Sequence, residues 1–278
     1  MTTNTNAIQD LVDRIPALQK IDRQILKELS DRLQPLRYRM GQVILRRETI
    51  PAQIMFLWEG QARLIAQIPK TTSPITLEIL KPGAVIGWAS LIRNVPCETA
   101  IASIESICFA LDTSDFLQFC DHDPAFKAAF ANQVSTSEVF DLLAMEMERR
   151  AQGPSDFTQV VRDTWQDASV ITFSSGKTPL TKLDPDCVWL VSGGQNITIP
   201  VGSRIELKRD FIEVPEGGYL RLIGLRDNFA IRTEVVEELP PHPTAFDIPY
   251  APDLPTVADI GDQSLSGIPA IHQHSLKW

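Results

Sequence analysis

The chain has little positive charge, few cysteines and no long hydrophobic run. Its 278 residues carry 26 Lys and Arg against 35 Asp and Glu, a formal net charge of −9 at pH 7. Because nucleic-acid partners require clustered basic residues to neutralise phosphates, this balance argues against one. No apolar stretch approaches the roughly 20 residues that span a bilayer, and the N-terminal residues lack the pattern of a secretory signal. We therefore expect a cytoplasmic protein.

Motifs that would identify an enzyme or a metal site are incomplete. The four cysteines, with neither a CxxC pair nor a repeated spacing, are expected to be free thiols. Residues 175–178 resemble the end of a phosphate-binding loop, but Ile171 stands where that motif needs a glycine. His272 and His274 have no third metal ligand nearby, and His122 is better explained by its place at a helix boundary. We predict no catalytic residues, no metal site and no enzymatic activity.

The segment from residue 36 to residue 111 is typical of an antiparallel β-roll. Short apolar runs alternate there with turn residues, and many short strands at regular spacing favour a roll or barrel that can enclose one small ligand. Glu59-Gly60, between two such runs, predicts a hairpin. The predicted strands are Val43 to Leu45, Ile54 to Trp58, Ala62 to Ile68, Ile75 to Leu80, Thr99 to Ile104 and Ile107 to Leu111.

Helices are expected on both sides of the roll. Residues 7–33 contain apolar residues at helical spacing and predict two amphipathic helices, for which the pattern by itself suggests the capping of a sheet edge. Asp123-Pro124 predicts a helix start. Residues 135–138 form a capping box that opens a further helix, and residues 152–154 (Gln-Gly-Pro) indicate a linker.

A second β module and an acidic tail complete the predicted architecture. Short strands and glycine turns recur between residues 170 and 225, with no helix-turn-helix pattern. The Pro- and Asp-rich end carries one basic residue, Lys277, and is typical of an extended linker or docking segment. The fold class is mainly β with flanking helices, and the predicted parts are N-terminal helices (1–34), a β-roll with C-terminal helices (35–150), a small β domain (151–232) and a tail (233–278).

Residues 80–102 are the candidate site within the roll. Pro82-Gly83 signals a turn, Gly87 introduces one turn of helix, Pro96 ends it, and Thr99 begins another apolar run. A strand, a glycine-led short helix and a second strand can direct backbone N–H groups toward an anion. The same pattern also fits an ordinary tight crossover between strands.

Around this site, residues 21–147 resemble the cyclic-nucleotide-binding domain of the catabolite-activator superfamily. The resemblance is carried by LRYRMGQVILRRETI, FLWEGQARLI, KPGAVIG and the ending Pro-x-x-Thr-Ala. It implies a β-roll and a cassette in which a glutamate binds the ribose and an arginine pairs with the cyclic phosphate. Here Gly87 matches the family's glycine, but Trp88 stands at the glutamate position and Cys97 at the arginine position, followed by the acidic Glu98.

These departures predict a degenerate cassette. Tight cyclic-nucleotide binding is not expected, no cofactor is required, and a cyclic nucleotide or another small anion is the only ligand that the resemblance suggests. Trp88 either stacks on a ligand or plugs an empty pocket. Arg46, Arg47 and Arg63 are the nearby cations, and more simply belong to the solvated surface. The candidate ligand-binding residues are Gly87, Trp88, Ala89, Ser90, Cys97, Glu98 and Thr99.

A second resemblance covers roughly residues 20–230. IGWASL, PCETAIAS, WLVSGG, IPVGSRIEL and LRLIGL are similar to the cytosolic N-terminal region of bacterial peptide exporters of the ABC class, including cyanobacterial exporters with a cysteine-peptidase domain. The resemblance implies an exporter or peptidase domain as partner, at the inner face of the membrane. The first resemblance also implies a homodimer through the helix at residues 135–149.

Together these observations predict a non-enzymatic regulatory or sensor module. Filling a pocket behind residues 87–99 would change the packing of the flanking helices and bias a partner domain. The alternatives are a scaffold or assembly domain with a permanently closed pocket, and a catabolite-activator-like regulator without a DNA-binding domain.

Overall fold

The computed structural model describes residues 12–15, 18–68, 74–150 and 157–226. The chain divides into two compact units, Met1–Thr233 and Glu234–Trp278, and every described residue belongs to the first. The predicted tail, with His272 and His274, and most of the first predicted helix lie outside the described residues. The division of the chain at residues 34, 150 and 232 stays a prediction.

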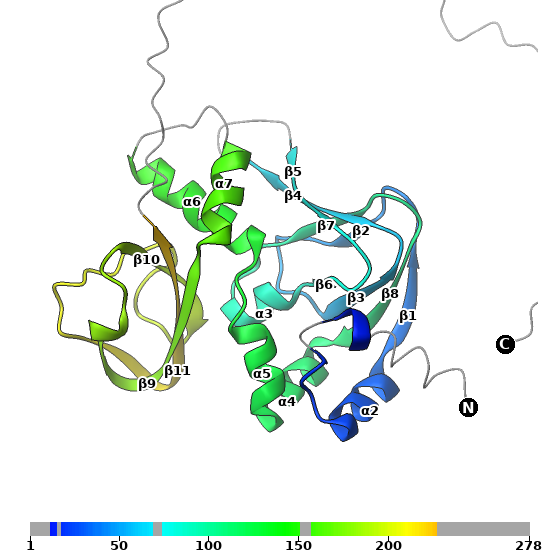
Figure 1. Cartoon of the computed structure of the whole chain (residues 1–278), viewed down its shortest axis with the longest axis horizontal. Coiled ribbons are helices and arrows are strands. Elements are labelled where there is room, and N and C mark those ends of the chain that lie inside the picture. Colours follow the sequence, from blue (N-terminus) through cyan, green and yellow to red (C-terminus); the bar gives the residue numbers. More distant parts are fainter. Residues whose placement is uncertain (1–11, 16–17, 69–73, 151–156, 227–278) are drawn as a thin grey trace, which may run out of the picture. The chain divides into compact units, whose positions relative to one another are not determined.

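Eight strands form the two antiparallel sheets of a β-roll (Figure 1). One sheet has the order β1-β8-β3-β6 and the other the order β2-β7-β4-β5. Most of these strands were predicted from short apolar runs, whereas β1 and the two-residue β6 were not. The strands are β1 (Gln34–Tyr38), β2 (Val43–Leu45), β3 (Gln53–Glu59), β4 (Ala62–Gln67), β5 (Pro74–Leu80), β6 (Val85–Ile86), β7 (Thr99–Ala102) and β8 (Ser106–Asp112).

The predicted hairpin at Glu59-Gly60 is wrong. β3 ends at Glu59 in one sheet, and β4 begins at Ala62 in the other, so the two strands do not pair. Gly60 has φ 90°, and a Cβ there would collide with the carbonyl oxygen of Glu105. A glycine at this point lets the chain pass between the sheets while pressed against the turn before β8.

Six helices are described outside the sheets: α2 (Arg23–Arg32), α3 (Trp88–Arg93), α4 (Thr113–His122), α5 (Pro124–Ala131), α6 (Thr136–Arg150) and α7 (Phe157–Gln166). The predicted helix start at Asp123 is confirmed, because its carboxylate accepts the N–H groups of Ala125 and Phe126. The capping box is confirmed as well: Glu138 accepts the N–H of Ser135 at 3.4 Å, and the Ser135 hydroxyl accepts the N–H of Ser137 at 3.2 Å.

A separate three-stranded antiparallel sheet, here called the second sheet, follows α7 with the order β10-β11-β9. It confirms the predicted class, mainly β with helices and a second small β module. Its strands are β9 (Ser169–Pro179), β10 (Cys187–Gln195) and β11 (Phe211–Arg226), with a 3₁₀ turn at Leu180–Lys182. The helix α7, which was not predicted from the sequence, leads into β9 and not into a DNA-reading helix.

Two sequence patterns in this part have a different structure from the one they suggest. Residues 197–207 form no regular strand: they make the isolated bridge between Arg204 and Leu190 and a few backbone hydrogen bonds to β10, and Gly202 (φ 80°) turns the chain against Met145. Residues 175–178 lie within β9, and Gly176, Lys177 and Thr178 pair with β11. They therefore lack the strand-to-helix turn that a phosphate-binding loop requires.

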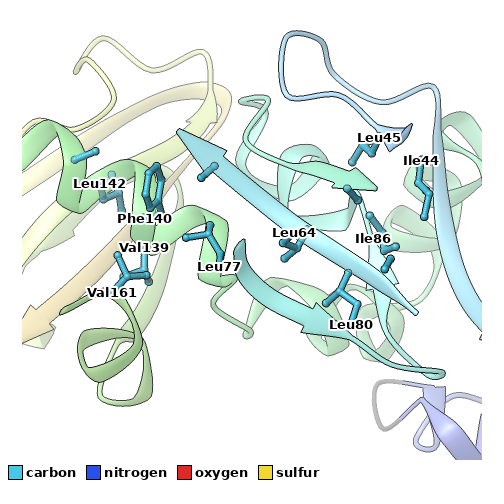
Figure 2. Packing of buried hydrophobic residues seen from close by; sticks show 14 of the residues in the cluster. Ile44, Leu45, Leu64, Leu77, Leu80, Ile86, Val139, Phe140, Leu142 and Val161 are labelled. Carbon is cyan, nitrogen blue, oxygen red and sulfur yellow. The ribbon is translucent and has the colours of Figure 1, made fainter. Parts of the chain in front are cut away.

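One hydrophobic cluster joins the roll to the second sheet. It contains Leu64 and Leu80 of the roll, Phe140 of α6 and Ile223 of β11. Figure 2 shows the roll side chains and those of α6 and α7 in this continuous packing. A second cluster, built on α2, α4 and α5, lies against β3 and α3. Within the described residues, no helix is long and apolar enough to cross a membrane.

Candidate functional site

The turn between β6 and β7 has the predicted glycine-led short helix. Gly87 adopts the left-handed conformation (φ 96°) immediately before α3, and the nearest atoms to a Cβ placed there lie at ordinary contact distances, 3.5 Å and beyond. A glycine is therefore favoured by its backbone conformation and not by lack of space. The N–H of Gly87 donates to Oε2 of Glu98 at 2.8 Å. A side chain of the protein itself thus takes this N–H of the predicted anion cradle.

Glu98 is almost completely buried, with 3% of its surface exposed. Burial raises the pKa of its carboxyl to about 7, against the opposing effects of the Gly87 N–H and the Arg93 charge, and the charges of Glu138 and Glu78 add to the rise. The bond from Gly87 is the sole hydrogen bond that Glu98 makes to a described residue, so its Oε1 atom has no such partner.

Trp88 lies at the start of α3 and is 8% exposed. Its ring packs against Phe130 of α5 with 6.1 Å between the centroids, and Phe130 in turn contacts Phe116 and Phe126. The indole is therefore part of the second hydrophobic cluster. It also lines the cavity of the roll, so both predicted roles of Trp88 are compatible with its position.

The remaining predicted site residues do not line that cavity. Cys97 donates its N–H to the hydroxyl of Ser90 at 3.2 Å, with 3.4 Å between the sulfur and the same oxygen. Burial raises the pKa of the Cys97 thiol to about 12, so it is not a reactive thiolate. Ala89 is buried, and Thr99 accepts the N–H of Arg47 at 3.2 Å.

The cavity has a volume of about 240 Å³. Residues of the roll and residues of the helices form its wall. Of the predicted site residues, Trp88 and Glu98 belong to this wall. Two lining residues, Gln133 and Trp165, are exposed, and Trp165 donates its indole N–H to the carbonyl of Val134 at 2.8 Å. The full lining is Ile15, Leu64, Glu78, Leu80, Gly83, Ala84, Val85, Trp88, Glu98, Phe130, Gln133, Val134, Ser135, Thr136 and Trp165.

No Lys, Arg or His is among the described residues that line this cavity. Arg46 and Arg63 are exposed. Arg47 instead pairs with Asp141 of α6 at 3.0 Å. The cations considered from the sequence therefore do not supply a phosphate partner, and two glutamates make the wall acidic.

A buried charge network lies next to the cavity and joins α3, α6 and the second sheet. Arg221 of β11 donates to both carboxylate oxygens of Glu138, at 2.7 and 3.0 Å. Arg93 is fully buried, donates to Asp141 at 3.3 Å and to the carbonyl of Ser192 at 3.1 Å, and lies 4.0 Å from Glu138. The three elements are thus joined by buried pairs of opposite charges.

The net pKa shifts of the two carboxylates of α6 are opposite in direction. For Glu138, burial raises the pKa, but the hydrogen bond and charge of Arg221 and the charge of Arg93 outweigh it, and the pKa is lowered. For Asp141, burial outweighs the charges of Arg93 and Arg47, and the pKa is raised. Glu138 therefore carries the charge that binds the second sheet.

Sequence reasoning identified Glu138 only as a capping residue and missed Arg93 and Arg221. A signal was present: Arg93 and Arg221 are single charges within the apolar runs SLIRNV and YLRLIGL. A lone charge in a buried segment indicates a buried partner. His122, by contrast, lies at the end of α4, where its Nδ1 is 2.7 Å from the carbonyl oxygen of Gln118.

Comparison with known proteins identifies the roll. Residues 35–123 match the cyclic nucleotide-binding domain family, and this segment has that fold. The chain is 26% identical over 151 residues to acetyltransferase Pat of Mycolicibacterium smegmatis, a match that covers 48% of this chain and 45% of that protein. It is 25% identical over 134 residues to cyclic nucleotide-gated ion channel 2 of Arabidopsis thaliana, covering 45% of this chain and 18% of that protein.

The chain thus spans less than half the length of these two curated relatives. Among solved structures, it is similar to a putative cyclic nucleotide-binding protein from Geobacter metallireducens GS-15, with 18% identity and a TM-score of 0.35. That match covers 41% of this chain and 82% of the other.

Proposed function

We propose that this chain is a non-enzymatic regulatory module in which the state of the cavity in the roll is transmitted to the second sheet. A single observation carries the proposal. The segment 130–138, from the end of α5 to the first turn of α6, both lines the cavity and is held by Arg221 of the second sheet.

The contacts of this segment support a direct mechanical connection. On one side, Phe130, Val134 and Thr136 line the cavity. On the other side, Arg221 donates to the carbonyl oxygens of Ala131, at 2.6 Å, and Gln133. A displacement of this segment by a ligand would therefore change the geometry of an arginine rooted in β11.

The link is strong enough to transmit a preference between two arrangements. Removing one partner of a buried ion pair typically costs about 3–5 kcal/mol. A displacement of Glu138 is therefore expected to move Arg221 with it and not to break the ion pair. Coupling between two sites in proteins is commonly about 1–3 kcal/mol, and a ligand supplies it only through its different affinities for the two arrangements. Arg204 adds a further link, since its Nε donates to Glu146 of α6 at 3.1 Å.

The proposal includes a degenerate cassette. A charge-assisted hydrogen bond contributes about 1.5–3 kcal/mol, which corresponds to about tenfold or more in affinity. No described cation lines the cavity, and Glu98 both takes the N–H of Gly87 and adds negative charge. Tight binding of cyclic AMP by phosphate contacts is therefore not expected.

The partner proposals rest on sequence motifs. An ABC-type peptide exporter, or its peptidase domain, at the inner face of the membrane is the proposed recipient of the signal. Binding of the whole chain to a co-expressed exporter in detergent would test it, and the absence of a complex would oppose it. A homodimer through residues 135–149 is also proposed. Its contact surface in that helix would include Met145, which is 39% exposed, and not Phe140 or Leu143, which the same chain covers.

A scaffold with a closed pocket is the second candidate function. The packing of Trp88 on Phe130 and the internal bond from Gly87 to Glu98 favour it, because both fill the region where the family's ligand would bind. The two candidates differ in whether a change inside the cavity reaches the second sheet.

The test fills the cavity without a ligand. Ala84→Leu adds an isopropyl group at a half-buried lining residue, and Ala52→Leu, an identical change at an exposed residue of the roll, is the matched control. Amide hydrogen exchange, read by mass spectrometry, should change in Ala84→Leu both at residues 131–138 and in β10 and β11, and in neither place in Ala52→Leu. Val85→Ile repeats the test with a smaller addition.

Two outcomes would decide against the sensor. Exchange that changes within the roll alone would leave the scaffold as the better description. Equal changes in the Ala52→Leu control would show that the response is unrelated to the cavity. Measured against Arg221→Met alone, the double variant Ala84→Leu/Arg221→Met should show no further change in β10 and β11 and should preserve the response of residues 131–138.

A further inference from the structure

The wall of the cavity has the chemistry of a site for a cation. It combines apolar side chains with two carboxylates, Glu78 and Glu98, and no basic residue among those described. The charge of Glu78 is close enough to raise the pKa of Glu98. A positive group placed at Glu98 would relieve this repulsion, whereas a phosphate would increase it.

Glu98 presents an unfilled acceptor to the cavity. Its Oε2 atom receives the N–H of Gly87, its Oε1 atom has no hydrogen-bond partner among the described residues, and 3% of the residue is exposed. Among the described residues, the fully buried side-chain atoms without a partner are Nη2 of Arg93 and Oγ of Ser103, so Oε1 of Glu98 is not sealed off and is open to the cavity that Glu98 lines. A ligand that donates hydrogen bonds would satisfy this oxygen.

Glu78 already accepts a hydrogen bond from a neighbouring side chain and is less buried than Glu98. Its Oε2 atom accepts the hydroxyl of Thr136, the first residue of α6, at 2.8 Å, and the side chain is half-buried. Of the two carboxylates, Glu98 is therefore the one that would receive the ligand directly. Glu78 would contribute its charge from the wall.

Aromatic rings define the rest of the ligand. Trp88 and Phe130 line the cavity from α3 and α5, and the exposed edge is bordered by Trp165. Indole and phenyl faces attract cations and pack against apolar bodies. The volume of about 240 Å³ lies below the roughly 300–1,000 Å³ of pockets for drug-sized molecules, so a ligand with one ring or a short alkyl body fits best.

We propose that the cavity binds a small organic amine, with its ammonium group on the free oxygen of Glu98 and its apolar body against the sides of Trp88 and Phe130 that line the cavity. This inference rests on the proposed function, since it names the ligand class of the same cavity. In the arginine–phosphate pair that the family resemblance implies, the protein supplies the positive group and the ligand the negative one. In the proposed site the protein supplies the carboxylate and the ligand the ammonium group.

The binding test uses three probes that share a phenylethyl body and differ in their head group. They are 2-phenylethylammonium, 2-phenylethanol and 3-phenylpropanoate, titrated into the whole chain by calorimetry and by tryptophan fluorescence. We expect saturable binding of the ammonium probe, weaker binding of the alcohol and none of the carboxylate. Cyclic AMP serves as a fourth titrant and should give neither a saturable heat signal nor a change in tryptophan fluorescence.

Substitution at the carboxylate distinguishes this site from unspecific binding. Glu98→Gln should weaken the ammonium probe by about tenfold or more, because it removes a charged hydrogen bond. Glu59→Gln, at an exposed glutamate of β3, is the matched control and should leave the affinity unchanged. Affinity should also rise with pH between about 5.5 and 8 in the wild type, as the Glu98 carboxyl, with a pKa of about 7, loses its proton, and should stay level in Glu98→Gln.

Failure of this inference can be separated from failure of the proposed function. If the ammonium probe does not saturate at millimolar concentration, or binds equally to Glu98→Gln, the amine site is refuted. A response of the second sheet to Ala84→Leu would then still support the regulatory module. If the amine binds through Glu98 and Ala84→Leu leaves β10 and β11 unchanged, the ligand class stands and the transmission does not.

Discussion

Replacing Glu98 by glutamine should alter the way in which the stability of the protein depends on pH. Burial raises the pKa of this carboxyl from 4.5 to about 7 in the folded state. Below about pH 4.5 the group is protonated in both the folded and the unfolded chain, so it has no effect on the difference between them. Between the two pKa values the unfolded chain gives up its proton while the folded chain keeps it.

Stability is therefore lost as pH rises through this window. The folded state binds more protons there, so the free energy of unfolding falls with pH until both states are ionised above about pH 7. A rise of about 2.5 in pKa corresponds to a total loss of about 3 kcal/mol. Glutamine has no proton to lose, and Glu98→Gln should not show this loss.

The measurement is the difference between two urea-unfolding series. Wild type and Glu98→Gln are unfolded at several values from about pH 4.5 to about pH 8, where the loss should be complete. Subtraction removes the contributions of the other titrating groups, including Glu138 and Asp141. We expect the stability of the wild type relative to Glu98→Gln to fall by about 3 kcal/mol across the range.

A flat difference would refute the reasoning, because it would mean that Glu98 has the same pKa in both states. A difference that rises with pH would be equally contrary, since it would require a folded pKa below the unfolded one. Glu59→Gln, with its exposed side chain, is the control for making this substitution in the roll.

Two further predictions concern the connection to the second sheet, and both can be measured by urea unfolding at neutral pH. Arg221→Met removes the arginine that donates two hydrogen bonds to the buried Glu138, and it should lower the free energy of unfolding by about 3–5 kcal/mol. The control is Arg226→Met, at the exposed end of the same strand, which should change that free energy by less than about 0.5 kcal/mol. Equal effects of the two substitutions would contradict the buried network. Gly87→Ala should cost only about 1–2 kcal/mol for its left-handed backbone, because a Cβ has room there. Gly193→Ala should cost more, because its Cβ would overlap the backbone carbonyl of Arg93 and force α3 away from β10; the reverse order would refute the close approach.

Local patterns determined much of the fold. The apolar run predicted at residues 43–45 corresponds to β2, the run predicted at 99–104 contains β7, which ends at Ala102, and the helix starts at Asp123 and Ser135 have the predicted capping bonds. The glycine-led turn at Gly87 was predictable for the same reason. Each of these features depends on residues only a few positions apart, so the sequence states both partners of the interaction.

The tertiary structure alone decided which strands pair and which groups meet in the site. Gly60 carries the chain from one sheet to the other because Glu105, far along the sequence, comes against it. Glu98 occupies the N–H of Gly87, which spacing alone does not reveal, and Arg221 reaches Glu138 from 83 positions away. Burial, and with it the raised pKa of Glu98, exists only once these distant segments exclude water. The sequence therefore determined a roll whose strands are interrupted by a short glycine-led helix, and the packing of distant segments made its cavity acidic and linked it to the second sheet.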